Sequence, residues 1–558
     1  MAQKPQNNFG SLLSVAILLL ALGLRFVGLG DAPLTEYEAG AALAAHDVAS
    51  GEATEFGPQP AYALLTNLPF RIFGESEILA RFLPAIVGLA LVALPFFWRD
   101  LLGDKVALVL SFSLAIDPGL VAISRLASGR ILAVAAVLFA VTAWRYRRPV
   151  LTGILAALAL LAAPTIYFGL GAALLTAIVL RWQPPLKQED VRIGGLALLI
   201  TLVLGGTLLF TGTAGLAGAI SVLSGFVLGQ VAIPGEGLAV VLLALLAYSL
   251  PAIIFGTMGA ARAWEVGDRL GKALSIFAAF SLLLVLLNPN RQVADLVWVI
   301  LPLWVLSASL IARYLTLPRE ELLVAIAEAA LMLLLAVYLA MALLDAIRES
   351  QFVLDGGWLR GLLVLGVLGF AGLATLLIGL GWSQRGALQG LVWAAALISS
   401  LWLVAASTRF ARIDATSAND LWSPGPATGS MGILEATLND VEFFQQGQEQ
   451  PLSVDVQIDS AAVRWALRDY SSLNLDGITS AMAVTPWTGE VPAEFAGYRG
   501  QSFAANIRRV WNPLPPDVLA WFFLRQGPTQ PELMALWVRA DLFPGGDLSL
   551  QIDPQTAP

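Results

Sequence analysis

Residues 11–29, SLLSVAILLLALGLRFVGL, are followed directly by residues 30–39, GDAPLTEYEA. The first stretch is about as long as the ~20 apolar residues that a helix needs to cross a bilayer. It lacks a strong basic flank and a clean small-residue cleavage site, so it is interpreted as a membrane span and not as a signal peptide. The second stretch is polar and carries three acids. Together they predict a membrane helix that leads into an acidic loop at the bilayer surface.

Similar apolar runs recur along the first three quarters of the 558 residues. The chain is 58% hydrophobic and 13% charged, with a mean hydropathy of +0.76, whereas soluble domains carry about 25% charged residues. The sequence therefore predicts an α-helical polytopic membrane protein with about 13 transmembrane helices. The predicted spans are 11–29, 79–98, 105–123, 130–145, 150–163, 165–181, 193–210, 237–260, 273–288, 296–313, 322–345, 359–381 and 387–407.

The orientation follows from the basic residues in the short loops, because Lys and Arg favour the cytoplasmic side. Most of these loops lie inside if the N-terminus is inside. The loop with Arg262, Arg269 and Lys272 also lies inside if the Gly-, Ala- and Ser-rich segment 214–234 does not cross. We therefore predict a multi-pass protein of the plasma membrane with a cytoplasmic N-terminus and an extracytoplasmic C-terminal domain.

Two long segments are predicted to lie on the outer side of the membrane, the first loop and the tail. The first loop, 30–78, belongs to a transmembrane domain at 1–409, and Thr35 is expected to cap a short helix at 36–50. The tail, 410–558, alternates polar and apolar residues at 452–458 and is predicted to form a soluble mixed α/β domain. Arg71 is the one basic residue of the first loop. The acidic residues of the loop are Asp31, Glu36, Glu38, Asp47, Glu52, Glu55, Glu75 and Glu77.

Composition excludes several kinds of site. The chain has no cysteine and a single histidine, His46, so thiolate metal sites and histidine clusters are excluded. From residue 410 onward there are 17 acidic residues and 8 Arg but no Lys. An acidic tail without a basic stripe argues against nucleic acid as a partner.

Carboxylates at the mouth of a helical bundle are candidates for proton transfer. Glu36 and Glu38 are two residues apart, so on a helix they diverge by about 200° and only one can face a given cavity. That one would act as a general base toward a hydroxyl group. The alternative is that both acids complement the helix dipole and face water.

Arginines on the predicted outer side are candidates for binding a phosphate by forked hydrogen bonds. Arg81 begins the second span, Arg125 and Arg130 flank an outer turn, and Arg291 lies in another. The alternative for each is interfacial anchoring with the charged end in water.

These residues also carry a family resemblance. Residues 28–39, GLGDAPLTEYEA, resemble the first outer loop of the C superfamily of membrane glycosyltransferases (GT-C). That superfamily includes the protein O-mannosyltransferases, the aminoarabinose transferases and the wider family 39-like group. Further similar segments are GPQPAY at 57–62, FGESE at 73–77, ARFLPAIVG at 80–88, Asp117-Pro118, Ser124-Arg125, Arg291 with 298–302, and WALRDY at 465–470. The match is good across 25–150 and patchy thereafter.

The resemblance implies inverting transfer of a sugar from a polyprenyl-phosphate donor to a protein or glycolipid acceptor on the outer face. It implies that Glu38, with Glu36 in reserve, is the catalytic base. Tyr37 stands where the family has an acid, and no acid is present near 128–130. The donor phosphate and lipid are expected at Arg81, Arg125, Arg130, Arg291, Tyr62 and Tyr37. Some relatives use a divalent metal, which is not favoured here because the matched positions lack a dense acidic cluster.

Two alternatives remain open at this point. The missing acids favour a catalytically degenerate relative that binds a lipid carrier or a partner protein without turnover. A secondary transporter ranks last, because Glu328 is the main mid-span charge and no internal repeat is visible.

Overall fold

The structure is a computed structural model of the 558-residue chain. It describes residues 8–50, 58–182, 187–207, 216–218, 220, 223–224, 226–227, 235–316, 321–348, 357–411, 418–444, 453–470 and 480–542. The predicted non-crossing segment 214–234 lies mostly outside these residues.

A helix is present at each of the thirteen positions predicted as spans. By length and composition, seven of the described helices can cross a membrane, or eight if one bent pair is a single span, and three shorter apolar helices accompany them. The chain is thus a multi-pass helical membrane protein, while thirteen crossings stay a prediction. The helices are α1 (Asn8–Phe26), α4 (Glu77–Ala93), α6 (Asp104–Ile116), α7 (Pro118–Arg125), α8 (Arg130–Arg145), α9 (Pro149–Ala162), α10 (Ile166–Val179), α11 (Gln188–Gly206), α13 (Leu238–Val266), α14 (Arg269–Leu287), α15 (Val297–Tyr314), α16 (Leu322–Arg348), α17 (Gly357–Gly381) and α18 (Gln384–Phe410).

The predicted span 105–123 consists of two helices, α6 and α7, which are bent by 57°. Pro118 is the first residue of α7, where its missing N–H costs no hydrogen bond. Asp117 caps α7, because its carboxylate accepts a hydrogen bond from the Leu120 amide at 2.9 Å. The Trp304 indole of α15 donates to the other carboxylate oxygen at 2.8 Å. The break is therefore fixed by a cap, a proline and a contact with the bundle core.

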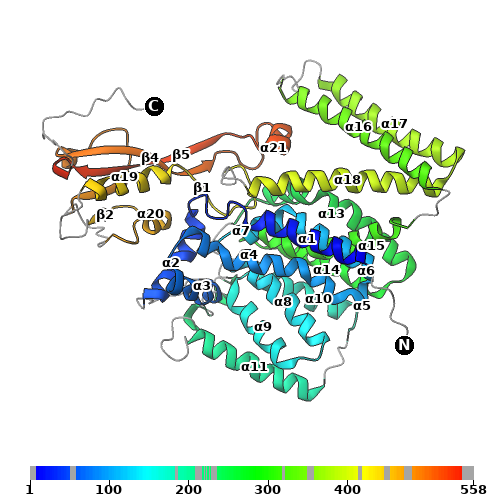
Figure 1. The fold of residues 1–558 in the computed structure, drawn as a ribbon, viewed down its shortest axis with the longest axis horizontal. Coiled ribbons are helices and arrows are strands. Elements are labelled where there is room, and N and C mark those ends of the chain that lie inside the picture. The colour runs from blue at the N-terminus through cyan, green and yellow to red at the C-terminus, as the bar shows by residue number, and fades with distance from the viewer. Residues whose placement is uncertain are drawn as a thin grey trace.

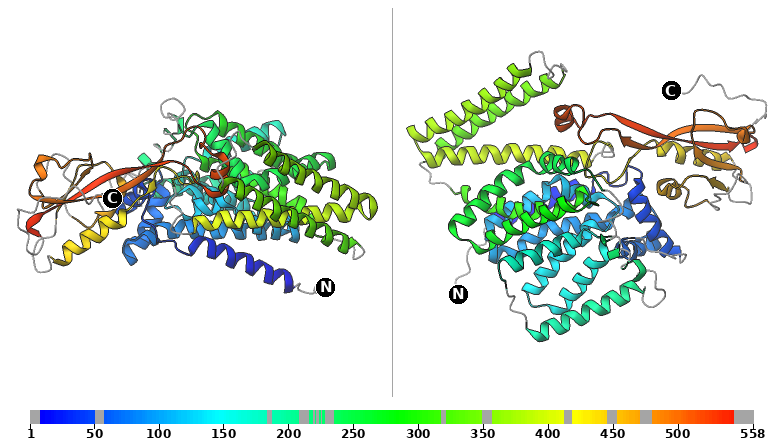
Figure 2. Two further views of the ribbon diagram at one scale, coloured as in Figure 1. Left: turned by 90° about the horizontal axis from the view of Figure 1, so that it is seen from above. Right: turned by 180° about the vertical axis from the view of Figure 1, so that it is seen from behind.

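Among the described candidate spans, the one that contains α15 (Val293–Tyr314) is the most buried, with 83% of its apolar window inside the protein. The helices α16 and α17 form a hairpin that stands away from the main bundle and contacts α18 (Figures 1 and 2). Glu328 of α16 is fully buried there and accepts a hydrogen bond from the Thr375 hydroxyl of α17 at 2.5 Å.

The first loop folds into two helices, α2 (Glu36–Ser50) and α3 (Pro60–Phe73), which pack against each other. The predicted helix 36–50 and its cap are confirmed. The Glu38 amide donates to the Thr35 hydroxyl at 3.4 Å, and the Thr35 amide donates to the Glu38 carboxylate at 3.1 Å. This reciprocal pair is a capping box.

The tail contains a five-stranded sheet in the order β1-β4-β5-β3-β2. Figure 1 shows the long strands β4 and β5 side by side. Only β2 and β3 pair in parallel. The strands are β1 (Ala427–Thr428), β2 (Val454–Val456), β3 (Met482–Pro486), β4 (Tyr498–Arg509) and β5 (Thr529–Arg539), and the helices are α19 (Met431–Phe444), α20 (Ala461–Ala466) and α21 (Val518–Leu524). This mixed α/β architecture confirms the predicted fold class.

The tail also joins the transmembrane core directly. Leu421, Trp422, Trp511 and Trp521 belong to the same buried apolar cluster as α7, α13 and α15. The tail is therefore held against the bundle by shared packing, and its residues contribute to the surface at which the spans end.

Candidate active site

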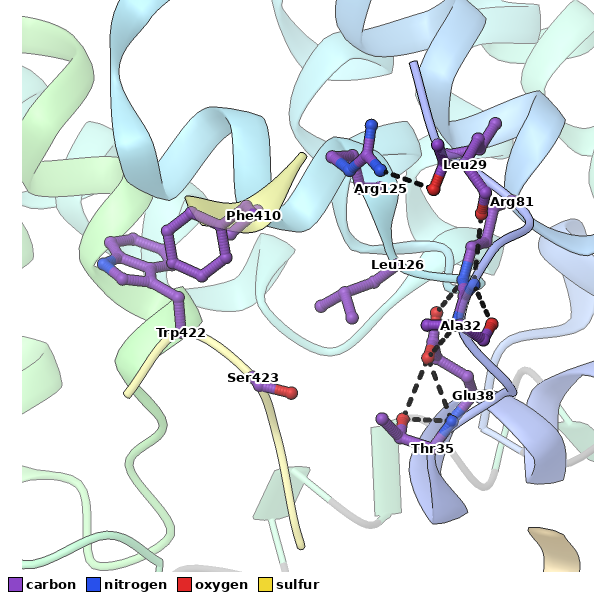
Figure 3. Close-up of a pocket in the computed structure, with 12 residues that line it drawn as sticks. Leu29, Ala32, Thr35, Glu38, Arg81, Arg125, Leu126, Phe410, Trp422 and Ser423 are labelled. Atoms are coloured by element: carbon purple, nitrogen blue, oxygen red, sulfur yellow. Dashed lines mark hydrogen bonds and ion pairs between the residues drawn. The ribbon is translucent and has the colours of Figure 1, made fainter. Parts of the chain in front are cut away.

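A small pocket opens where the ends of α1 and α7 meet the first loop and the tail (Figure 3). Its free volume is about 60 Å³, which is room for several water molecules. The residues that line it are Gly28, Leu29, Ala32, Thr35, Glu38, Arg81, Ala122, Arg125, Leu126, Phe410, Trp422 and Ser423. Three of the predicted site residues, Glu38, Arg81 and Arg125, are therefore together.

Glu38 is held by hydrogen bonds to both carboxylate oxygens. Oε1 accepts from Arg81 Nε at 2.7 Å and from the Ala127 amide at 3.0 Å. Oε2 accepts from Arg81 Nη2 at 2.9 Å and from the Thr35 amide and hydroxyl, both at 3.1 Å. Figure 3 shows the bonds of Glu38 with Arg81 and Thr35 along one wall of the pocket. The carboxylate is thus fixed in position by α2, α4 and the turn before α8.

The network also determines the charge of Glu38. Its side chain is 1% exposed, and burial alone would favour the protonated form. The positive charge and hydrogen bonds of Arg81, with the Ala127 and Thr35 amides, outweigh burial, so the pKa of Glu38 lies below its ordinary value. The pocket therefore contains a carboxylate that stays ionised at neutral pH.

Arg81 connects this carboxylate to the loop backbone. Its Nη1 donates to the carbonyls of Leu29 and Ala32, at 3.1 and 2.7 Å, and its Nη2 donates to the Pro33 carbonyl at 3.0 Å. A planar guanidinium is suited to this because it has five donors in a fixed arrangement. Arg81 therefore shapes the loop that carries Glu38.

Arg125 donates hydrogen bonds to the main-chain carbonyls at the C-terminal end of α1. Its Nη1 donates to the carbonyls of Leu24, Arg25 and Val27 at 2.9–3.2 Å, and its Nη2 donates to the Gly28 carbonyl at 3.0 Å. These groups include carbonyls that a helix C-terminus leaves without an intrahelical partner. Carbonyls are neutral, and no carboxylate of the described chain lies within ion-pair distance of Arg125. A positive charge therefore remains at the pocket.

Glu36, the reserve base, does not line the pocket. Its carboxylate accepts from the Ser460 hydroxyl at 2.8 Å and from the amides of Ala461 and Ala462 at 2.5 and 3.2 Å. These groups begin α20, so Glu36 joins the first loop to the tail. The expected divergence of Glu36 and Glu38 is confirmed, since Glu36 contacts the tail and Glu38 contacts Arg81 and the turn before α8.

Tyr37 and Arg130 form a neighbouring cluster. The Arg130 guanidinium lies 4.5 Å from the centre of the Tyr37 ring and donates to the Gln292 side chain. Gln59 donates to the Tyr37 hydroxyl at 2.6 Å and accepts from the Gly129 amide at 2.5 Å. The turn between α7 and α8 thus contacts both Glu38 and this cluster.

Tyr62 and Arg291 lie outside the residues that line the pocket. The Tyr62 hydroxyl is buried and donates to the Ala80 carbonyl at 2.7 Å. Arg291 Nη1 donates to the Glu236 carbonyl at 3.3 Å. The four arginines therefore do not converge on one pocket, and only Arg81 and Arg125 reach it.

Sequence reasoning missed the contribution of the tail. Trp422 and Ser423 line the pocket beside Phe410 at the end of α18 (Figure 3). The Trp422 ring packs on Gly119, where a Cβ atom would lie 2.3 Å from the ring. The available signal was a tryptophan close behind the last span and a glycine after Pro118. Neither identifies the other as its partner.

Within the described residues, no group of three or more His, Asp or Glu side chains is arranged to hold a metal ion. The charged groups at the pocket are Glu38, Arg81 and Arg125.

Comparison with known proteins shows similarity in structure. No family model and no curated protein sequence matches the chain. The crystal structure of ArnT from Cupriavidus metallidurans bound to undecaprenyl phosphate superposes with a TM-score of 0.51 at 15% identity, over 84% of this chain and 85% of that one. The apo form gives a TM-score of 0.53 at 15% identity, over 86% and 93%. The Archaeoglobus fulgidus oligosaccharyltransferase gives 0.42 at 14% identity, over 86% and 70%.

The superposition on ArnT, an aminoarabinose transferase, extends over most of both chains. The chain therefore has a GT-C-like fold, and the predicted resemblance to this group is confirmed at the level of the fold.

Proposed function

We propose that this protein is a membrane glycosyltransferase that moves a sugar from a polyprenyl-phosphate donor to an acceptor at the outer face of the membrane. The observation that carries the proposal is the GT-C-like fold over 84–86% of the chain, shared with ArnT, which was crystallised with undecaprenyl phosphate. The pocket supports it, because a carboxylate and two guanidinium groups lie together where several apolar helices end.

In this proposal, the donor phosphate binds near Arg125. Its guanidinium is buried, lines the pocket and has only neutral carbonyls as hydrogen-bond partners. A fixed positive charge in a poorly solvated site stabilises a departing phosphate, whose charge grows as its bond to the sugar breaks. Arg81 adds charge but is largely neutralised by Glu38.

Glu38 is the proposed base. The acceptor oxygen attacks the anomeric carbon from the face opposite the phosphate, the carbon–oxygen bond to the phosphate breaks, and the polyprenyl phosphate leaves with the bonding electrons. The acceptor proton passes to Glu38, which gives up its bond from the Thr35 hydroxyl. Because its pKa is lowered, Glu38 is a weak base, so we expect proton transfer late in the attack.

The test is transfer of labelled sugar by the purified protein in lipid nanodiscs, with a panel of polyprenyl-phosphate sugars and of protein and glycolipid acceptors. Wild type is compared with Glu38→Gln, Glu36→Gln and the matched surface variant Glu265→Gln, whose carboxylate is exposed. We expect Glu38→Gln to lower turnover by about 10²–10⁴-fold. Glu265→Gln should match wild type, and Glu36→Gln should retain most activity.

A second function is favoured by one observation, namely that both oxygens of Glu38 are already engaged and Glu36 is bound to the tail. A GT-C-like scaffold that binds the lipid carrier without turnover would have this arrangement. Saturable binding of polyprenyl phosphate with no transfer across the panel would replace the first proposal by this one. An equal loss of activity in Glu265→Gln would show that the assay reports folding.

A further inference from the structure

Two further pockets lie between α8, α9, α10 and α11, away from the Glu38 pocket. One has a free volume of about 350 Å³ and the other about 260 Å³. Both are lined by Trp144, Thr152, Ala156 and Leu198. Because these residues are shared, the two pockets adjoin along α9, and together they are called the groove.

The two ends of the groove differ in chemistry. The larger end is lined almost entirely by apolar side chains, such as Val137, Ile166 and Leu170. The smaller end is lined by Arg147 and Arg148, with Asp190 as its one carboxylate. A groove that is apolar along its length and carries two guanidinium groups at its mouth matches a lipid with an anionic headgroup.

The local structure leaves these two guanidinium groups available. The other polar side chains of the turn are engaged, because Arg145 binds Asp100 at 2.5 Å and the Tyr146 hydroxyl donates to the Phe97 carbonyl at 2.6 Å. Arg147 has a φ of 52°, in the left-handed region. Both Arg147 and Arg148 are exposed, and among the described residues neither side chain has an ion-pair or hydrogen-bond partner.

The basic end lies far from the Glu38 pocket. The turn that contacts Glu38 precedes the first residue of α8, and Arg147 follows its last. Sixteen helical residues separate the two ends, a length of about 24 Å. The groove and the pocket thus lie toward opposite ends of α8. The basic end is the one that the orientation rule assigns to the cytoplasmic side.

We propose that this groove binds an anionic phospholipid of the leaflet at the Arg147–Arg148 end, with its phosphate at the two arginines and an acyl chain against Ala156. This site is separate from the donor site proposed above. It selects membrane phospholipid by headgroup charge and chain together.

The experiment is native mass spectrometry of the full chain released from nanodiscs of phosphatidylcholine with about 10% phosphatidylglycerol. Wild type is compared with the double variant Arg147→Gln/Arg148→Gln and with Ala156→Phe, which fills the apolar groove. The matched control is Arg181→Gln, since Arg181 also ends a helix with a positive φ, of 48°, but does not line the groove. Inorganic phosphate is added as a competitor in a separate arm.

We expect phosphatidylglycerol to remain bound to wild type and to Arg181→Gln. The double variant should lose affinity by about thirtyfold, since each basic residue near a bilayer surface contributes roughly fivefold. Ala156→Phe should also release the lipid, and inorganic phosphate should not displace it. Equal retention of phosphatidylcholine, an equal loss in Arg181→Gln, or displacement by inorganic phosphate would overturn the proposal. Circular dichroism of each variant separates loss of binding from loss of fold.

Discussion

At the scale of single residues, the decisive contact is the ion pair between Glu38 and Arg81. Both groups are nearly inaccessible to water, so the removal of one partner leaves a buried, uncompensated charge. Such a change typically costs about 3–5 kcal/mol. The pair therefore has a structural role whether or not Glu38 transfers a proton, and any activity loss in a Glu38 variant must be read beside its stability.

The pH dependence of stability tests this contact. The pKa of Glu38 is lowered in the folded protein by Arg81 and amide hydrogen bonds, against the effect of burial. Its stabilisation is therefore complete above the unfolded pKa of about 4.3 and is lost as the pH falls through the lower, folded value. We expect Glu38→Gln to be destabilised at pH 7 by about 3–5 kcal/mol and to lose less stability than wild type upon acidification. Denaturant unfolding in micelles from pH 3 to 8 measures both effects, and parallel curves would contradict the assignment.

At the scale of elements, the break between α6 and α7 positions the groups of the pocket. Asp117 caps α7 and accepts the Trp304 indole, and α7 carries Arg125 at its end. Asp117→Ala removes both acceptors and should lower the free energy of unfolding by about 1–3 kcal/mol. Asp117→Asn keeps a carbonyl oxygen for one of them and should cost less. Unfolding followed by intrinsic fluorescence ranks the two variants, and equal losses would show that the cap is not the cause.

At the scale of the whole molecule, the tail is docked on the first loop by Glu36. The amides of Ala461 and Ala462 donate to this carboxylate, and both alanines are also packed in the apolar cluster formed with α2 and α3. Glu36→Ala should therefore speed hydrogen exchange at the start of α20 by about tenfold, because losing a hydrogen bond to a charged group costs about 1.5 kcal/mol, while exchange in strand β3 is unchanged. Glu494→Ala, an acid in the tail away from this contact, is the control. If exchange became faster across the whole tail, the sheet would have unfolded. Unchanged exchange at α20 would refute the docking role of Glu36.

The helical positions were predictable because apolar length is a local property. Residues 36–50 formed the expected helix for the same reason, since Thr35 and Glu38 are three residues apart. The bend at Asp117 had a visible signal in Pro118, but its angle depends on Trp304, 187 residues away.

The site was predictable only in part. Glu38, Arg81 and Arg125 were expected to be near one another, and they share a pocket. Their partners were not predictable, because main-chain carbonyls at the end of α1 compete for Arg125 and the sequence does not show where a helix end will meet a side chain. Trp422 was missed because its partner, Gly119, has no side chain to suggest a contact.

The contact of Glu36 with α20 has a consequence for biosynthesis. The Glu36 carboxylate and its partners are 424 to 426 residues apart, and ribosomes add about 5–20 residues per second. Glu36 is therefore translated roughly 20 to 90 seconds before the backbone amides that it binds. During that interval the acidic loop leaves the ribosome without its final partner, so the contact between the first loop and the tail forms only after α20 has been translated.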